Sequence, residues 1–104
     1  MDLMGECTAL VERGYKCNMI GRRRTDPRSE DLTALAPQGP GYPTYTRSFP
    51  VIEWKYNLVW EYLRTFDVTY CCLYDQGYTS LGEIHNSCPN PALKNEDGTF
   101  KPAW

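Results

Sequence analysis

Residues 17–27 read Cys-Asn-Met-Ile-Gly-Arg-Arg-Arg-Thr-Asp-Pro. The short apolar run to Ile20 predicts a buried strand. The three arginines that follow it, with a hydroxyl, a carboxylate and a helix-breaking proline after them, predict a loop at the end of that strand. A guanidinium pairs with two phosphate oxygens at once and stays charged at physiological pH. The loop is therefore suited to hold an anion, and a solvated basic turn is the alternative interpretation.

The segment before this loop predicts a helix. Apolar residues recur at helical spacing, at positions 3, 7, 10 and 11, and Gly14 can end the helix in a left-handed cap. A strand from Lys16 to Ile20 then leads to the charged loop. This order forms half of an α/β unit, and ligands in open α/β sheets bind at the carboxyl ends of the strands.

Prolines dominate the next part of the chain. Residues 37–50 carry four prolines and two glycines, which predicts a long ordered loop or a linker and excludes both a helix and a central strand. Tyr42, Tyr45 and Arg47 lie within it. Such a loop is suited to lay a ring against a planar ligand, and the alternative is that its aromatic residues pin it to the core.

An amphipathic helix is predicted between Val51 and Phe66, because apolar residues recur every three or four positions in a stripe that we assign to the core. Residues 71–74 form a short apolar segment. Residues 75–82 form a glycine-punctuated turn, which either presents backbone N–H and hydroxyl groups to a phosphate or is an ordinary tight turn. His85 is expected at the surface.

Composition limits the classes of function. The chain has 104 residues, 41% of them hydrophobic, which suffices for one small core. A net charge of -2 argues against a general nucleic-acid binder, because such proteins need a basic surface. Five cysteines without a Cys-x-x-Cys pair, and a single histidine, support neither a zinc knuckle nor a disulfide framework. With no signal peptide and no apolar run of about 20 residues, we expect a soluble, cytoplasmic protein without a membrane partner.

Blocks of sequence along the whole chain resemble one known family. The blocks are Gly21–Pro27, Phe49–Trp54 with Val59–Leu63, Leu73–Gly82 and Asn90–Lys94. In this order and spacing they resemble eukaryotic FAD synthase, the FMN adenylyltransferase of the phosphoadenosine-phosphosulfate reductase-like group. The resemblance implies an α/β fold: a partial adenine nucleotide α-hydrolase-like parallel sheet of the PP-loop ATPase type, with flanking helices and a long Pro-rich loop. It also implies FMN and ATP as substrates, Mg²⁺ as the metal ion, and FAD and pyrophosphate as products.

The resemblance further implies roles for individual residues. Phosphate binding falls to Gly21, Arg23 and Arg24, and catalysis to Arg23 and Asp26. FMN binding falls to Arg24, Thr25, Asp26, Tyr42 and Arg47. The transfer depends on positioning and charge neutralisation, because the FMN phosphate attacks the equally anionic α-phosphate of ATP. Asp26 binds the polar edge of the flavin or a magnesium-bound water, or it only forms a turn before the proline.

Several positions depart from the family pattern. Gly39 stands where an aspartate of the flavin pocket is usual, and Gln76 where an arginine is common. Lys55 stands where a threonine or serine would cap the next helix, which costs that helix about 1 kcal/mol. The Ser-Gly-Gly-x-Asp-Ser loop that holds the ATP phosphates does not occur. We therefore expect residues 1–104 to be the carboxyl-side half of such a domain, without its tail, inactive alone, and either self-associating or lacking an amino-terminal half.

Two other functions stay open. The first is a non-catalytic flavin- or nucleotide-binding module, or a degenerate fragment, in which Gly39 marks lost chemistry. The second is a relative of the sulfonucleotide reductases or sulfurylases that shares the sheet. Residues 25–27 and 90–93 favour the flavin branch, and no reductase-type terminal cysteine motif occurs.

Overall fold

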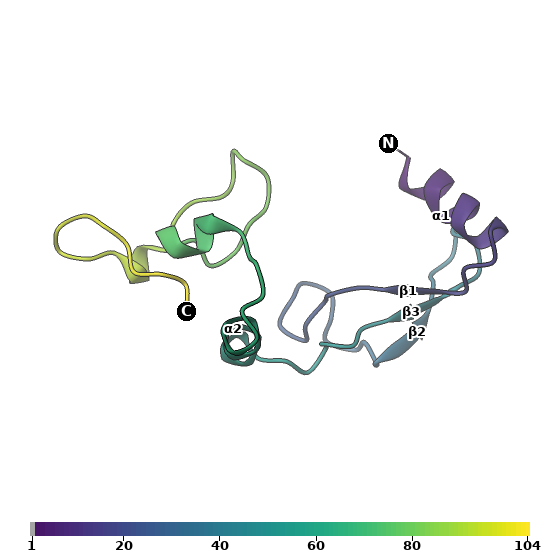
Figure 1. Ribbon diagram of the computed structural model, residues 1–104. Helices are drawn as coiled ribbons and strands as arrows, with labels where there is room; N and C mark the ends of the chain where they lie inside the picture. The colour runs from purple at the N-terminus through teal and green to yellow at the C-terminus, as the bar shows by residue number, and fades with distance from the viewer. Residues whose placement is uncertain (1) are drawn as a thin grey trace. The chain divides into compact units, whose positions relative to one another are not determined.

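The structure is a computed structural model that describes residues 2–104 (Figure 1). The chain forms two compact units, the first ending at Lys55 and the second running from Tyr56 to Trp104. The first unit contains one helix and three short strands, and the second contains one helix and two short 3-10 helices.

The helix of the first unit, α1 (Leu3–Glu12), has a strong cap at each end. The carboxylate of Asp2 accepts hydrogen bonds from the backbone N–H groups two and three residues further on, at 3.1 and 3.3 Å. At the other end Gly14 adopts φ +90°, and the N–H of Tyr15 donates to the carbonyl of Leu10 at 3.1 Å. This is the left-handed ending predicted for Gly14, and it satisfies carbonyls that the last helical turn leaves unpaired.

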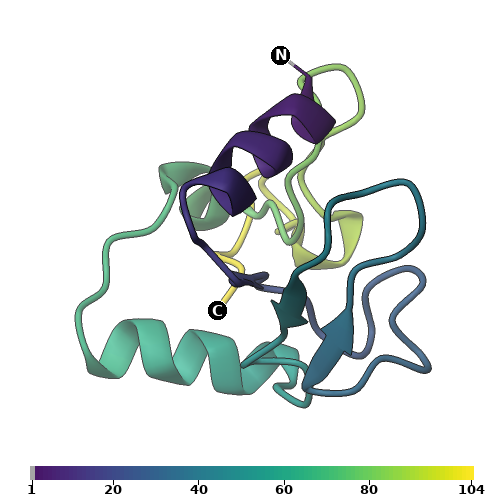
Figure 2. The ribbon, with the colours of Figure 1, turned by 90° about the vertical axis from the view of Figure 1, so that its right-hand side faces the viewer.

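A three-stranded sheet forms the body of this unit, in the order β1 (Cys17–Met19), β3 (Thr46–Ser48), β2 (Leu35–Pro37). β1 runs parallel to β3, with Asn18 opposite Arg47. β2 runs antiparallel to β3, and Figure 2 shows these two arrows pointing in opposite directions. The predicted α/β class is confirmed, with one parallel strand pair and an added antiparallel strand.

The Pro-rich stretch was predicted to exclude a central strand, and this prediction is wrong. β3 (Thr46–Ser48) lies inside that stretch and is the central strand of the sheet. The prolines leave residues 44–49 free, so every residue of β3 keeps the N–H that a ladder needs. Pro37 ends β2, an edge strand, where a missing donor is tolerated.

The expectation of a buried first strand is also wrong. All residues of β1 are exposed, and Met19 is 77% exposed. β1 is an edge strand, and within residues 2–104 only β3 pairs with it. The apolar face of α1 is likewise mostly exposed, because Cys7 is its one buried residue. The core of the unit lies instead beyond the carboxyl end of β3, around Phe49 and Ile52.

In the second unit, α2 (Tyr56–Thr65) begins five residues later than the predicted start at Val51. The residues before it form turns, in which the N–H of Trp54 donates to the carbonyl three residues back. Lys55 therefore does precede the helix directly, as expected. Assigning the whole apolar stripe to the core was wrong, because Leu58 and Phe66 are 41% and 66% exposed, and the buried residue of α2, Trp60, was not part of that stripe.

Aromatic rings hold the second unit together. The rings of Tyr70 and Tyr74 meet that of Trp60 edge to face, with centroids 5.0 and 5.2 Å away. The 3-10 helix η1 (Cys72–Gln76) ends at Gly77, whose φ is +85°. None of the described helices is long and apolar enough to cross a bilayer.

A short 3-10 helix, η2 (Pro91–Leu93), leads into a turn that is closed by a bridge between Lys94 and Phe100. Asp97 accepts hydrogen bonds from both the N–H and the hydroxyl of Thr99, at 3.0 and 2.6 Å. These bonds stabilise the carboxylate and hold the pKa of Asp97 below its ordinary value.

Candidate functional site

The arginine-rich loop and the segment after β3 meet at one edge of the sheet. β1 and β3 are parallel, so their carboxyl ends lie at the same edge. The backbone N–H of Arg24 donates to the carbonyl of Ile52 at 2.6 Å, which ties the two segments together. The predicted position of the charged loop, at the carboxyl end of its strand, is confirmed.

Arg23 and Asp26 form a closed turn within this loop. Asp26 Oδ2 accepts the backbone N–H of Arg23 at 2.7 Å, and the N–H of Asp26 donates to the carbonyl of Arg23 at 3.0 Å. Arg23 Nη2 lies 3.7 Å from Asp26 Oδ1, and the two side chains are 25% and 34% exposed. Asp26 therefore forms a turn, as one interpretation held, and it keeps a partly exposed ion pair with Arg23.

Arg24 is occupied by protein groups. Its Nη1 has three carbonyl oxygens within 3.2 Å, those of Ser29, Glu30 and Leu32. Its Nη2 is paired with the carboxylate of Glu53, and this hydrogen bond raises the pKa of Arg24 above its ordinary value. The arrangement gives Arg24 a structural part, and its direct contact with a phosphate stays a prediction.

Gly21 and Thr25 lie exposed on the same loop. A Cβ added at Gly21 would meet nothing within 4 Å, and its backbone is not in the left-handed region. The fold of residues 2–104 therefore does not require glycine here, whereas a phosphate approaching the backbone would. Phosphate contact by these two residues remains a prediction.

Tyr42 lies at the other edge of the sheet. Residues 38–45 join the end of β2 to the start of β3. They therefore lie at the opposite ends of the strands from the arginine loop, which follows the carboxyl end of β1. The N–H of Gln38 donates to the carbonyl of Tyr45 at 3.0 Å and closes this loop, and Tyr42 is 38% exposed. The structure thus places the predicted ring-binding tyrosine and the arginine loop on opposite edges.

Arg47 lies on the central strand, between these two edges. Its Nη2 donates to the carbonyl of Pro37 at 3.0 Å, and its guanidinium carbon lies 5.5 Å from the centre of the Phe49 ring. Its Nε is buried and has no hydrogen-bond partner among the described residues. A buried donor without an acceptor is uncommon, and an acceptor group of a ligand would supply the hydrogen bond that this N–H lacks.

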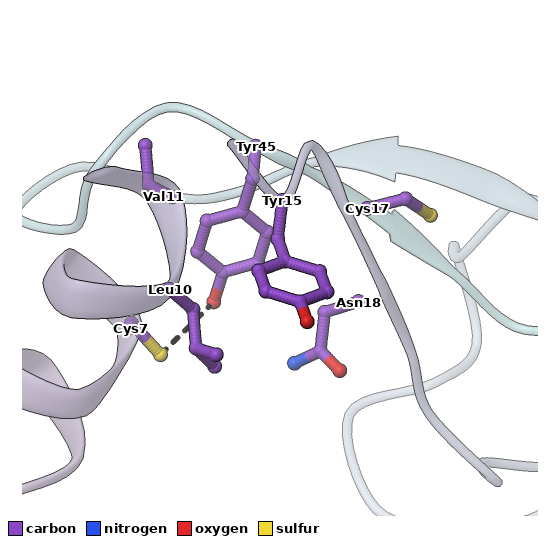
Figure 3. A pocket seen from close by; sticks show the side chains of 7 residues that line it. All are labelled: Cys7, Leu10, Val11, Tyr15, Cys17, Asn18 and Tyr45. Atoms are coloured by element: carbon purple, nitrogen blue, oxygen red, sulfur yellow. Dashed lines mark hydrogen bonds between the residues drawn. The ribbon is translucent and has the colours of Figure 1, made fainter. Parts of the chain in front are cut away.

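Sequence reasoning missed a pocket of about 310 Å³ beside α1 (Figure 3). It is lined by Cys7, Leu10, Val11, Tyr15, Cys17, Asn18 and Tyr45. The sulfur of Cys7 lies 3.6 Å from the hydroxyl of Tyr45, and this hydrogen bond, with burial, raises the pKa of Tyr45. For Tyr45 this contact favours the alternative interpretation, because the hydroxyl attaches the Pro-rich loop to Cys7, the buried residue of α1. The spacing of apolar residues in the helix was the only sequence signal for this contact.

A second pocket, of about 320 Å³, lies on α2 in the second unit. It is lined by Tyr56, Asn57, Trp60, Glu61, Arg64, Thr65, Ala103 and Trp104. The guanidinium carbon of Arg64 lies 3.4 Å from the centre of the Trp104 ring, so the cation already covers this ring. None of the residues predicted for the site lines this pocket.

The first unit has no complete set of protein ligands for magnesium among its described residues. Among residues 2–104 no group of three or more histidine, cysteine, aspartate or glutamate side chains is arranged to hold a metal ion. Magnesium is often bound by one or two carboxylates, with substrate phosphates and water completing the octahedron. Asp26, within the arginine loop, has one such carboxylate, and both of its oxygens already contact Arg23, so the residues fit only an ion that nucleotide phosphates mainly carry.

With this geometry the chain is recognised as a member of a known family. The family model for the phosphoadenosine phosphosulfate reductase domain matches residues 4–89, so the chain belongs to that family. Relatives that match most of the chain include FAD synthases. The probable FAD synthase of Schizosaccharomyces pombe is 44% identical over 94% of this chain. The flavin adenine dinucleotide synthase of Saccharomyces cerevisiae is 36% identical over 75% of it.

Solved structures agree with this assignment. The crystal structure of Candida glabrata FMN adenylyltransferase in complex with FMN and an ATP analogue matches 97% of this chain, with a TM-score of 0.82 and 28% identity. This chain covers only 37% of the S. pombe relative and 36% of the C. glabrata chain. The predicted resemblance and fold class are confirmed, and the chain spans about a third of the length of these proteins.

Proposed function

We propose that this chain provides the flavin-binding part of an FMN adenylyltransferase, an enzyme that transfers AMP from ATP to FMN and releases pyrophosphate. The observation that carries the proposal is the 44% identity to a probable FAD synthase over 94% of the chain. The likeness to a structure solved with FMN and an ATP analogue supports it. The match to a bacterial phosphoadenosine 5'-phosphosulfate reductase, from Xylella fastidiosa, covers only 49% of the chain and supports the reductase alternative less.

The phosphate of FMN is proposed to lie at the arginine-loop edge. The side chain of Arg23 is 25% exposed, so an incoming phosphate can approach its guanidinium, and Gly21 leaves room for close approach to the backbone. Arg23 would neutralise the two anionic phosphates that react, and Asp26 would keep its guanidinium in place. Thr25 is proposed to add a hydroxyl donor. Magnesium, when bound with ATP, would supply further charge neutralisation.

The isoalloxazine ring is proposed to lie toward the other edge, against Tyr42. A strand of three residues is about 10 Å long, so a ligand with a tricyclic ring, a five-carbon chain and a phosphate can reach from one edge to the other. Arg47 lies on the strand between the edges, and its unpaired buried Nε supports a contact with the flavin. The separation of the predicted residues thus suits an elongated ligand.

The ATP site is proposed to need residues beyond these 104, because the glycine-rich phosphate loop of the family does not occur among them. This chain would then bind FMN but not form FAD alone, and it would act with an amino-terminal half or with a second chain. Because both substrates are water-soluble small molecules, we propose a cytoplasmic location.

Calorimetry of the chain with FMN, and then with radiolabelled ATP, tests the proposal. We expect saturable FMN binding that Arg23→Ala weakens about tenfold or more, whereas the matched control Arg13→Ala at the end of α1 leaves it unchanged. Binding without FAD formation is expected of this part of the enzyme and equally of a non-catalytic module, and restoring the ATP half separates these two. Failure to bind FMN would contradict the proposal, and binding of a 3'-phosphoadenosine nucleotide instead would support the reductase alternative.

A further inference from the structure

Arg24 joins two chain segments that each contain a fully buried residue. Ser29 and Phe49, which are both fully buried, come from the two segments that Arg24 joins. The carbonyl of Ser29 accepts from Arg24 Nη1 and also from the backbone N–H of Leu32, both at 3.2 Å. The guanidinium therefore binds the carbonyl groups of residues 29–32 and closes residues 25–32 into a compact loop.

The bonds of Arg24 reach two separate stretches of chain. Its Nη1 serves carbonyls of residues 29–32, while its Nη2 and its backbone N–H bind Glu53 and Ile52 in the segment after β3. The planar guanidinium has two Nη atoms that point in different fixed directions, so one binds the carbonyls while the other binds Glu53, whereas a lysine ammonium has a single nitrogen for both. The carboxylate of Glu53 also offsets the positive charge that a phosphate would seek.

We propose that Arg24 is a positioning residue: with Glu53 it locks residues 25–32 onto the segment after β3, and it does not itself bind the phosphate. The part of this inference that concerns ligand binding rests on the proposed function. The turn formed by Arg23 and Asp26 contains Arg24, so the bonds that hold Arg24 in place also hold this turn in place. The lock therefore fixes the position and direction of the Arg23 guanidinium.

Amide hydrogen exchange tests the lock without any ligand. Arg24→Lys keeps the charge but loses the fork, and we expect exchange at the amides of Asp26 and Leu32 to rise about tenfold while the sheet amides stay unchanged. Glu53→Gln should raise the exchange rate of the same amides about threefold, as expected from the loss of an exposed ion pair. Arg28→Lys makes the same chemical change at an exposed arginine of this loop and should have no effect. Unchanged exchange in both Arg24→Lys and Glu53→Gln would overturn the lock.

FMN titration then separates positioning from direct contact. If Arg24 acts through the lock, Glu53→Gln weakens FMN binding about threefold, and adding it to Arg24→Lys weakens binding no further. If Arg24 binds phosphate directly, removing the competing charge of Glu53 leaves FMN binding unchanged or makes it tighter, and this result would overturn the proposal. Should the unmodified chain bind no FMN, the proposed function fails, and the exchange experiment still decides whether the lock exists.

Discussion

Replacing Gly39 by aspartate tests whether the loop between β2 and β3 forms part of a flavin pocket. In the family that this chain resembles, an aspartate of that pocket is usual at this position. A Cβ added at Gly39 would meet nothing within 4 Å, and the backbone of this half-buried residue is outside the left-handed region. The substitution is therefore expected to leave the stability of the fold nearly unchanged.

The expected gain in affinity follows from the new hydrogen bond. A hydrogen bond to a charged group contributes about 1.5–3 kcal/mol, which corresponds to roughly 10- to 150-fold in Kd. Because the loop keeps contact with water, we expect Gly39→Asp to tighten FMN binding by a value near the lower limit, about tenfold. The quenching of FMN fluorescence on titration with the chain measures this directly. Gly39→Asn, which has the same shape without the charge, should gain much less.

Riboflavin provides the second control, since it has the ring of FMN but lacks the phosphate. A carboxylate that contacts the ring must tighten the binding of riboflavin and the binding of FMN by the same factor. The reasoning would be refuted if Gly39→Asp folded normally and bound FMN no better than the original chain. It would also be refuted if FMN bound more tightly and riboflavin did not, because the new carboxylate would then act at the phosphate end of the ligand.

Three further predictions concern stability and charge. Gly77→Ala should destabilise the second unit by about 3 kcal/mol, seen as a lower Tm, because φ is +85° and the new Cβ would lie 2.6 Å from Phe100 Cβ. Asp2→Ala should cost α1 about 1 kcal/mol, measured by amide exchange in its first turn. The folded-state pKa of Asp97 is lowered, so its stabilising effect is complete above the unfolded value of about 3.9 and is lost as pH falls through the folded pKa. Thr99→Ala should raise that pKa toward its ordinary value in an NMR titration, and an unchanged pKa would contradict the assignment.

Local signals in the sequence predicted the first half of the first unit well. The helix ending at Gly14 and the charged loop at the carboxyl end of the next strand were predicted correctly, and so was the presence of that strand, although not its exposure. Each depends on neighbouring residues, such as the spacing of apolar positions or the need of a helix end for a residue with positive φ. A turn at Asp26 was one of the interpretations that the sequence left open, because an aspartate before a proline often forms such turns.

Features that depend on distant partners were missed. The central strand β3 has three residues among prolines, and only its pairing with β1 and β2 makes it a strand. The occupation of Arg24 could not be foreseen, because backbone carbonyls are its main acceptors and any residue type carries one. The late start of α2 has a similar cause, since turns before it satisfy the backbone.

Titration of the ¹⁵N-labelled chain with FMN, followed residue by residue in NMR spectra, tests the central claim most directly. The account predicts that FMN shifts amides in two groups, residues 21–26 at one edge of the sheet and residues 38–47 at the other. Riboflavin should shift only the second group, because it lacks the phosphate. Shifts confined to the α1 pocket or to the second unit, or no shifts at all, would contradict the account.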